Sequence, residues 1–221
     1  MKGVILAGGT GTRLLPLTRV ANKHLLPVYD RPMIYYPIQT LIDMGCDEII
    51  IISGGEHIGG FAELLGDGSL FGVQFTYRVQ KKADGVAGAL ACAKGLVEGS
   101  FPVILGDNFF GSVPPVLNKP AVYLSEVRDP ERFGVYSEGE IIEKPSNPSS
   151  NLAVVGLYMY DNTVFDFISE LVPSERSELE ITDVNNWYLR KSCEVIEYDG
   201  YWRDMGTINT LLEVANYVHN S

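Results

Sequence analysis

Three clustered glycines near the N-terminus would let the backbone fold closely around a bound group. Gly8, Gly9 and Gly11 lie in the segment from Leu6 to Leu14, directly after a short apolar run. Because glycine has no side chain, successive N–H donors can point at one ligand, and phosphate suits such donors. Neither GxxxxGK nor GxGxxG, the two common phosphate-binding spacings, is present. A tight turn between a strand and a helix accounts for the glycines equally well, so both interpretations stay open.

Two cations follow this glycine-rich segment. Arg13 comes two residues after Gly11, and Lys23 lies ten residues further on, ahead of Leu25-Leu26-Pro27-Val28. Each alone is more typical of a solvated surface. Together, beside a glycine cradle, they can clamp a pyrophosphate and stabilise the charge that builds on a leaving group.

Two aspartates are candidate metal ligands. Asp107 follows the apolar run 101–105, and ligand sites of open α/β sheets form where strands end. Asp204 lies ahead of a predicted helix. In isolation, Asp107 is better explained as capping a turn and Asp204 as a helix cap. A carboxylate at the position of Asp107 is nevertheless well placed for Mg²⁺, which takes one or two carboxylates and leaves its other positions to phosphates and water, and Asp204 is the candidate partner.

The pattern of apolar residues predicts β-α units stacked around a mostly parallel sheet. Four consecutive isoleucines in Glu48 to Ser53 indicate a strand buried on both faces. Gly45 is expected to end the helix that precedes it. The segment 144–151 is interpreted as a surface loop, so 1–221 is expected to form one domain. Further strands are expected at 4–6, 73–79, 101–105, 122–127 and 152–160, with short ones around Gly134 and Ile141, and helices at 58–65, 87–97, 164–171, 182–190 and 207–218.

Composition narrows the class of protein. The net charge of −11 argues against a nucleic-acid binder, because affinity for a phosphate backbone needs clustered Lys and Arg. No apolar run approaches the length of a membrane-spanning helix, and the N-terminal run is too short for a secretory signal. Cys46, Cys92 and Cys193 are odd in number and form no CxxC pair, which indicates neither a disulfide framework nor a zinc site. A cytoplasmic protein is expected.

The glycine-rich segment is also the first part of a longer pattern. Together with Pro16-Leu17-Thr18 and the stretch KHLLPVYDRPMIYYP from Lys23 to Pro37, it resembles the signature of the glucose-1-phosphate thymidylyltransferases, which are sugar-phosphate nucleotidyltransferases. The resemblance implies a Rossmann-like, three-layer α/β/α fold with a mixed, mostly parallel sheet. It also implies dTTP and glucose 1-phosphate as substrates, Mg²⁺ as cofactor, and a product, dTDP-glucose, used for deoxysugar or surface-polysaccharide synthesis.

The family's site residues transfer to matching positions of this chain. The resemblance implies a catalytic role for Arg13 and Lys23. It also implies that Asp107, in the Gly-Asp-Asn motif, and Asp204, in the Trp-x-Asp-x-Gly-Thr motif, bind the metal. The residues implied to bind the nucleotide are Leu6, Gly8, Gly9, Thr10, Gly11, Thr12, Gln80, Gly85 and Asp107. Those implied to bind the sugar phosphate are Gly134, Glu143, Lys144, Val154 and Tyr158.

On the sugar side, simpler explanations compete with these roles. Glu143 and Lys144 beside a proline would otherwise be an exposed hairpin end, and Tyr158 on an alternating strand could equally belong to the core. Thr182 and Asp183 also match the family pattern, and capping a helix is the favoured explanation for both.

The sequence departs from the family pattern in four places. Gly88 stands where many relatives have Gln, which puts a polar contact to the base in doubt, and Phe133 replaces a common Tyr. The segment from Gly111 to Pro120 is short, and the chain ends at Ser221 where fuller relatives continue. Feedback inhibition at a second site is therefore not carried over, and the oligomeric state stays open, a homo-oligomer included.

The expected reaction needs no protein nucleophile. An oxygen of the sugar phosphate attacks the α-phosphorus of the nucleotide in line with departing pyrophosphate, so positioning and charge stabilisation carry catalysis. Scattered histidines and the absence of a GxSxG elbow agree with this chemistry. The alternatives are another pair, UTP with glucose 1-phosphate or GTP with mannose 1-phosphate, and a non-catalytic module that binds nucleotide-sugars.

Overall fold

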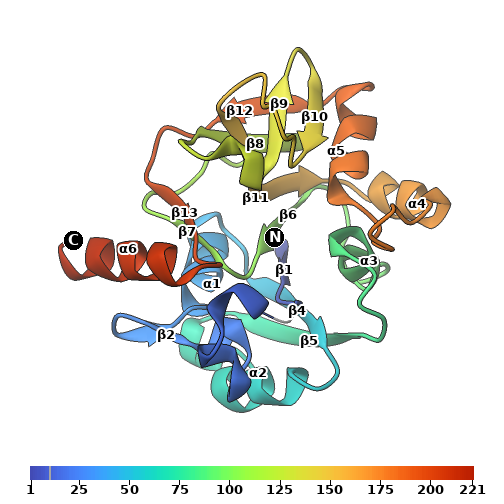
Figure 1. Ribbon diagram of the computed structural model, residues 1–221. Coiled ribbons are helices and arrows are strands. Elements are labelled where there is room, and N and C mark those ends of the chain that lie inside the picture. The colour runs from blue at the N-terminus through green and yellow to red at the C-terminus, as the bar shows by residue number, and fades with distance from the viewer. Residues whose placement is uncertain (10) are drawn as a thin grey trace.

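A nine-stranded mixed sheet forms the centre of the molecule (Figure 1). The structure is a computed structural model that describes residues 1–9 and 11–221, so the role expected for Thr10 lies outside the described residues. Four strands run parallel in the order β6-β1-β4-β5. They are β1 (Lys2–Leu6), β4 (Glu48–Gly54), β5 (Gln74–Gln80) and β6 (Phe101–Leu105).

The rest of the sheet is added through one long strand. β11 (Leu152–Tyr160) pairs antiparallel with β6 and carries further strands on its other side. These are β8 (Ala121–Glu126), β9 (Gly134–Ser137), β10 (Glu140–Glu143) and β12 (Glu194–Glu197). The expected mixed α/β sheet is confirmed, and strands 101–105 and 152–160 have the predicted bounds.

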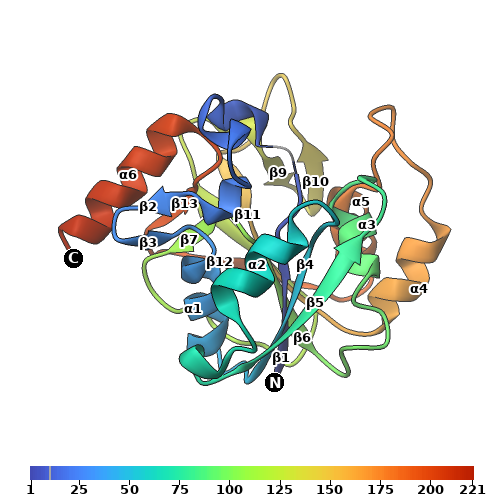
Figure 2. The same cartoon turned by 90° about the horizontal axis from the view of Figure 1, so that it is seen from below.

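Helices cover both faces of the sheet, which gives the expected three layers. α1 (Tyr35–Asp43) and α2 (Ile58–Leu65) pack against Ile5, Ile49 and Ile51 on one face. α3 (Val86–Ala91), α4 (Thr163–Glu170) and α5 (Ile181–Leu189) pack against Ile50 and Ile52 on the other. Figure 2 shows the two groups of helices on opposite sides of β1 and β4. The isoleucines of β4 alternate between these two cores, as a strand covered on both faces requires.

A third, smaller core lies beside the sheet. α6 (Ile208–His219) packs through Val214 onto Leu14, Val28 and Met33. Two short ladders border it: β2 (Pro27–Val28) with β3 (Arg31–Pro32), and β7 (Asn108–Phe110) with β13 (Trp202–Asp204). Single turns of 3₁₀ helix fill the connections at Thr12–Leu14, Leu17–Arg19, Lys23–Leu25, Ser69–Phe71 and Pro130–Arg132.

The structure corrects the predicted elements in two ways. The helix expected over 87–97 ends at Ala91. From Cys92 to Lys94, each backbone N–H donates to the carbonyl three residues earlier, which makes tighter turns than an α-helix, and Gly95 follows with φ +79°. The short strands β7, β12 and β13 were not predicted, because three or four residues carry no periodicity and their partners lie far away in the sequence. Gly45, with φ +88°, does follow the end of α1 as expected.

Among the described residues, no helix has the length and apolar character that crossing a membrane requires.

Burial of β4 on both faces gives a stability prediction. Ile50→Ala and Ile51→Ala should each lower the free energy of unfolding by about 2–5 kcal/mol, because each side chain is fully buried in a different core. Leu70→Ala is the control, since Leu70 is 90% exposed and its removal leaves no cavity. Urea unfolding measures the free energy of unfolding of all three variants. If one face of the sheet were open to solvent, one of the two isoleucine variants would be as stable as Leu70→Ala, which would contradict the prediction.

Candidate active site

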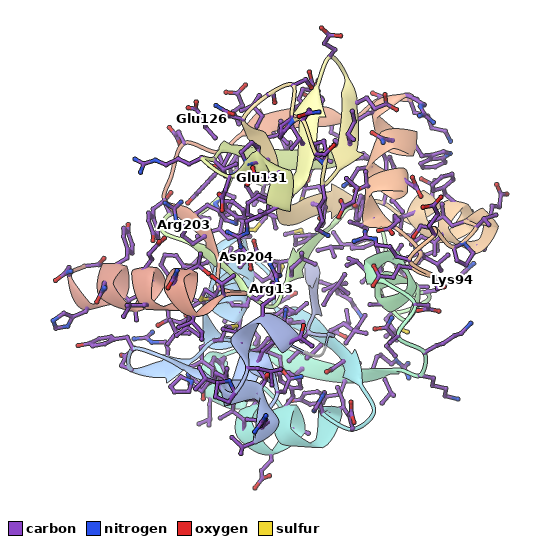
Figure 3. All side chains as sticks on the ribbon, viewed as in Figure 1. Arg13, Lys94, Glu126, Glu131, Arg203 and Asp204 are labelled. Atoms are coloured by element: carbon purple, nitrogen blue, oxygen red, sulfur yellow. The ribbon has the colours of Figure 1, made fainter. Side chains whose placement is uncertain are left out.

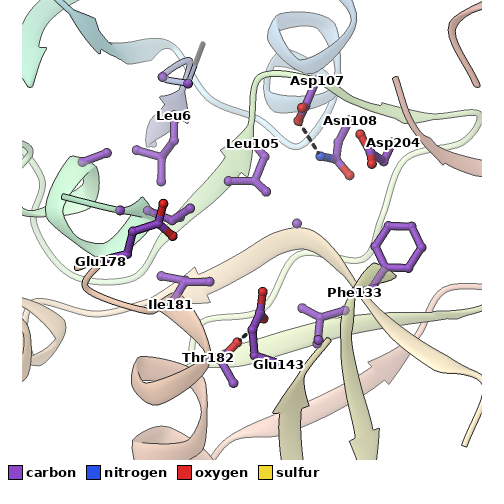
Figure 4. A pocket seen from close by; sticks show the side chains of 18 of the residues that line it. Leu6, Leu105, Asp107, Asn108, Phe133, Glu143, Glu178, Ile181, Thr182 and Asp204 are labelled. Atoms are coloured by element: carbon purple, nitrogen blue, oxygen red, sulfur yellow. Dashed lines mark hydrogen bonds between the residues drawn. The ribbon is translucent and has the colours of Figure 1, made fainter. Parts of the chain in front are cut away.

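A cavity of about 380 Å³ opens where the parallel strands end, the edge at which open α/β sheets bind ligands. Segments far apart in the sequence meet there, as Figure 4 shows: Asp107, Asn108 and Asp204 lie on one side, and Glu143 and Thr182 lie across from them. The sequence-predicted residues that line the cavity are Leu6, Gly8, Gly9, Arg13, Lys23, Gln80, Gly85, Asp107, Gly134, Glu143, Lys144, Val154, Tyr158 and Asp204.

Gly11 and Thr12 do not line the cavity. Gly11 has φ +63°, and a Cβ there would lie 2.8 Å from Cγ2 of Thr18 and 3.1 Å from Cβ of Lys23. Its carbonyl accepts a hydrogen bond from Oγ1 of Thr18 at 2.9 Å. Thr12 begins the 3₁₀ turn that carries Arg13. The two interpretations of the glycines thus apply to different residues: Gly8 and Gly9 face the cavity, and Gly11 makes the tight turn.

Lys23 and Asp107 form an ion pair on the wall of the cavity. Nζ of Lys23 donates to Oδ2 of Asp107, and both side chains are largely buried. Burial alone would raise the pKa of Asp107, but the Lys23 ammonium outweighs it and lowers the pKa to about 2. Asp107 therefore stays ionised at neutral pH.

The β7–β13 ladder brings the second aspartate next to the first. Asp204 pairs with Asn108 in this ladder, and the backbone N–H of Met205 donates to the carbonyl of Asp107 at 2.8 Å. Burial, together with the charge of Asp107, raises the pKa of Asp204. The backbone N–H of Gly206 donates to its Oδ1 at 2.7 Å.

Two arginines lie beside Asp204. Nη2 of Arg132 is 3.4 Å from its Oδ2, and Nη1 of Arg13 is 3.9 Å from the same oxygen; Figure 3 labels Arg13 and Asp204 as neighbours at the centre of the molecule. Arg132 was missed by the sequence analysis. It lies one residue before Phe133, in a stretch that was noted for its sugar-side resemblance, so position in that motif was the available signal.

Asn108 and Trp202 were also given no role from the sequence. Nε1 of Trp202 donates to Oδ1 of Asn108 at 2.7 Å, and Nδ2 of Asn108 donates to Oδ1 of Asp107 at 3.1 Å. A bulge in β11 makes room for this chain of bonds, because Gly156 has φ +65° and a Cβ there would lie 2.9 Å from Nδ2 of Asn108. The three bonded residues hold the Asp107 carboxylate in one orientation.

Glu143 lies at the opposite wall, at the end of β10. Its Oε2 accepts from Oγ1 of Thr182 at 2.7 Å, and its Oε1 accepts from Nζ of Lys144 at 2.8 Å. Burial would raise the pKa of Glu143, but the bonds from Lys144 and Thr182 outweigh it and lower the pKa. Glu143 is therefore not an exposed hairpin end, whereas half of the Lys144 side chain is exposed.

The prediction that Thr182 caps a helix is wrong. Glu180 holds the cap position of α5, and the Thr182 hydroxyl is used by Glu143 instead. Tyr158 belongs both to the core and to the site. It is 2% exposed and stacks on Tyr160 with 5.4 Å between the ring centroids, and it also lines the cavity.

His24 is a buried neutral histidine behind the cations. Its backbone N–H and its Nδ1 both lie within hydrogen-bond distance of Oδ1 of Asn22, at 2.9 and 2.8 Å. Because that oxygen only accepts, Nδ1 carries the hydrogen. Burial, and then the charge of Lys23, lowers the pKa of His24 to about 3.

This pKa predicts acid sensitivity. The unfolded chain protonates His24 below about pH 6.5 and the folded protein does not, so stability falls as the pH is lowered, by about 1.4 kcal/mol per pH unit down to pH 4. Denaturant titrations of His24→Gln should show that slope removed. His219→Gln, at an exposed position, is the control. A slope unchanged in His24→Gln would contradict the assignment.

Glucose-1-phosphate thymidylyltransferases are among the known proteins with similar sequences. The sequence model of the nucleotidyl transferase family matches residues 2–221. A glucose-1-phosphate thymidylyltransferase of Neisseria gonorrhoeae is 44% identical over 237 residues, which cover 99% of this chain and 82% of the relative. One of Mycobacterium tuberculosis is 41% identical with the same coverage.

Solved structures agree with the sequence relatives. A Bacillus anthracis protein assigned as a glucose-1-phosphate thymidylyltransferase, crystallised with sucrose, is 46% identical, with a TM-score of 0.91 over 100% of this chain and 96% of that one. A UDP-glucose pyrophosphorylase in complex with UDP-glucose is 25% identical, with a TM-score of 0.85 over 99% and 98%. The chain therefore belongs to the nucleotidyl transferase family, where it groups with the glucose-1-phosphate thymidylyltransferases.

Proposed function

We propose that this enzyme transfers a thymidylyl group from dTTP to α-D-glucose 1-phosphate, giving dTDP-glucose and pyrophosphate, and that residues 1–221 act as one nucleotidyltransferase domain. One observation carries the proposal: a single cavity joins a glycine-lined wall, two cations and two carboxylates to a second wall with a charged Glu-Lys pair. A nucleotide and a sugar phosphate can lie against these opposite walls at the same time.

The nucleotide side has the groups that a triphosphate needs. Gly8 and Gly9 leave the backbone open to the cavity, so that their N–H groups can reach phosphate oxygens. Arg13 and Lys23 supply positive charge where pyrophosphate departs, and charge stabilisation of this kind is the main demand of phosphoryl transfer. The sugar phosphate is already an anion near neutral pH, so its attack on the α-phosphorus requires no strong general base.

Asp107 and Asp204 fit a divalent cation, for which Mg²⁺ is our assignment. They are neighbouring carboxylates at the cavity wall, and among the residues that the structure describes no group of three or more acidic, His or Cys side chains is arranged to hold a metal ion. Mg²⁺ takes such a pair and completes its coordination with phosphate oxygens and water. When bound, it would neutralise phosphate charge during the transfer. The Lys23 ammonium holds Asp107 ionised and ready for this role.

On the other wall, Glu143 is oriented to accept hydrogen bonds from sugar hydroxyls, because Thr182 and Lys144 fix its two oxygens. The side chain of Lys144 is half exposed, and its ammonium can neutralise the sugar phosphate. Gly134, Val154 and Tyr158 complete this wall and limit the room for the sugar.

The substrate pair is tested by the rate of pyrophosphate release. The enzyme should be fastest with dTTP and glucose 1-phosphate when dTTP, UTP, ATP and GTP are each combined with glucose 1-phosphate and mannose 1-phosphate. A clear preference for a purine triphosphate would overturn the thymidylyl assignment.

The role of Asp107 is tested by Asp107→Asn, a nearly isosteric change. Turnover with Mg²⁺ should fall roughly a hundredfold or more, because the ion loses a charged ligand worth several kcal/mol in the transition state. Asp43→Asn is the control, since Asp43 is exposed and lies outside the cavity. Circular dichroism checks that both variants fold. Wild-type rates in Asp107→Asn would remove Asp107 from the mechanism.

A further inference from the structure

The side-chain amide of Gln80, at the end of β5, is fixed in one orientation. Its Nε2 donates to Oδ1 of Asp84 at 3.0 Å and to the backbone carbonyl of Gly85 at 3.1 Å. Both partners are pure acceptors, so the amide nitrogen and not the oxygen must face them. The orientation therefore follows from hydrogen-bond chemistry.

The amide oxygen of Gln80 is left to face the cavity. Oε1 is 3.3 Å from the place where a Cβ of residue 8 would lie, and Gln80 and Gly8 both line the cavity. With both N–H groups used inside the protein, Gln80 can offer a ligand only an acceptor.

Asp84 can hold Gln80 in this way because residue 88 has no side chain. A Cβ on Gly88 would lie 2.1 Å from Oδ1 and 2.7 Å from Cγ of Asp84. Any larger residue at position 88 would displace the carboxylate from its place beside Gln80. Gly88, the departure from the family pattern, thus has a structural reason in this chain: it provides the space that Asp84 occupies.

The loop that carries Asp84 is anchored by the segment that leads into α5. The backbone N–H of Leu179 donates to the carbonyl of Asp84 at 2.7 Å, and the N–H of Ala87 donates to the carbonyl of Leu179 at 3.2 Å. Gly85, with φ +97°, allows this approach, because a Cβ there would lie 2.6 Å from the carbonyl oxygen of Leu179. The backbone of Asp84 is consequently held at a defined position.

We propose that Asp84 is a positioning residue for base selection: it orients the Gln80 amide, through the space left by Gly88, so that the cavity favours pyrimidines with an imide N–H over cytosine. The inference rests on the proposed nucleotidyl transfer. Asp84 itself is not among the residues that line the cavity, so it acts through Gln80.

The discrimination follows from the pattern of donors on the bases. Thymine and uracil carry N3–H between two carbonyls, and this hydrogen can be donated to Oε1 of Gln80. Cytosine in the same pose presents the lone pair of N3, so two acceptors face one another and a buried acceptor loses its partner. If the amide of Gln80 were free to turn over, its NH₂ group could donate to cytosine and the preference would be lost.

The test is a double-mutant cycle of Asp84→Ala and Gly88→Ala, with the dissociation constants of dTTP and dCTP measured by calorimetry. Each single variant should lower the affinity for dTTP about three- to tenfold, as loss of one oriented hydrogen bond predicts, and leave dCTP binding unchanged or tighter. The double variant should bind dTTP as each single variant does, since both changes release the same carboxylate.

Gly59→Ala is the matched control. It also adds a methyl group within a helix, α2, but its Cβ would have no neighbour within 4 Å, so the ratio of dTTP to dCTP affinity should stay at the wild-type value. Helix interiors ordinarily favour alanine over glycine, so Gly88→Ala should not weaken α3 through helix propensity. Weaker dTTP binding in this variant would therefore point to the displaced Asp84 carboxylate.

Three results would overturn the inference. They are an unchanged affinity ratio in Asp84→Ala, effects that add in the double variant, or an equal loss of dTTP and dCTP binding, which would mean general damage to the site. Failure of the proposed function would appear separately, as a preference of the wild-type enzyme for purine triphosphates.

Discussion

Two neighbouring carboxylates on one cavity wall are the constraint on which the site depends. Like charges repel strongly where burial removes water, and burial together with Asp107 raises the pKa of Asp204. The chain offsets this repulsion with cations: Lys23 pairs with Asp107, and Arg132 and Arg13 lie beside Asp204. The cations that offset the repulsion between the carboxylates also line or border the cavity, where they can meet phosphate.

The fold provides this arrangement by ending several chain segments at one edge of the sheet. β1 leads into the glycine loop, β5 ends at Gln80, and β6 is followed by Asp107, while β13 returns from the end of the chain to pair with β7. The antiparallel extension through β11 adds the second wall with Glu143. The three-layer core therefore holds two facing walls across one cavity, which we propose bind the nucleotide and the sugar phosphate.

The sequence predicted the parallel sheet and most helices because their signals are local. The isoleucines of β4 and the helix-ending Gly45 are examples. Most of the site residues that the motifs predicted line the cavity. The contacts between distant segments could not be predicted: Asn108 meets Trp202 only through the β7–β13 ladder, and Thr182 meets Glu143 only through packing of α5 against β10. The glycine interpretations could not be separated from sequence either, because facing the cavity and making a turn require the same residue type.

The central claim is that Asp107 and Asp204 together bind a divalent cation with the nucleotide. Titration of Mn²⁺, followed by electron paramagnetic resonance with and without dTTP, tests it most directly in the wild type and in Asp204→Asn. The account predicts metal binding that dTTP strengthens in the wild type and that Asp204→Asn weakens at least tenfold, as expected for loss of a charged ligand. Equal metal affinity in the two proteins with dTTP present would contradict it.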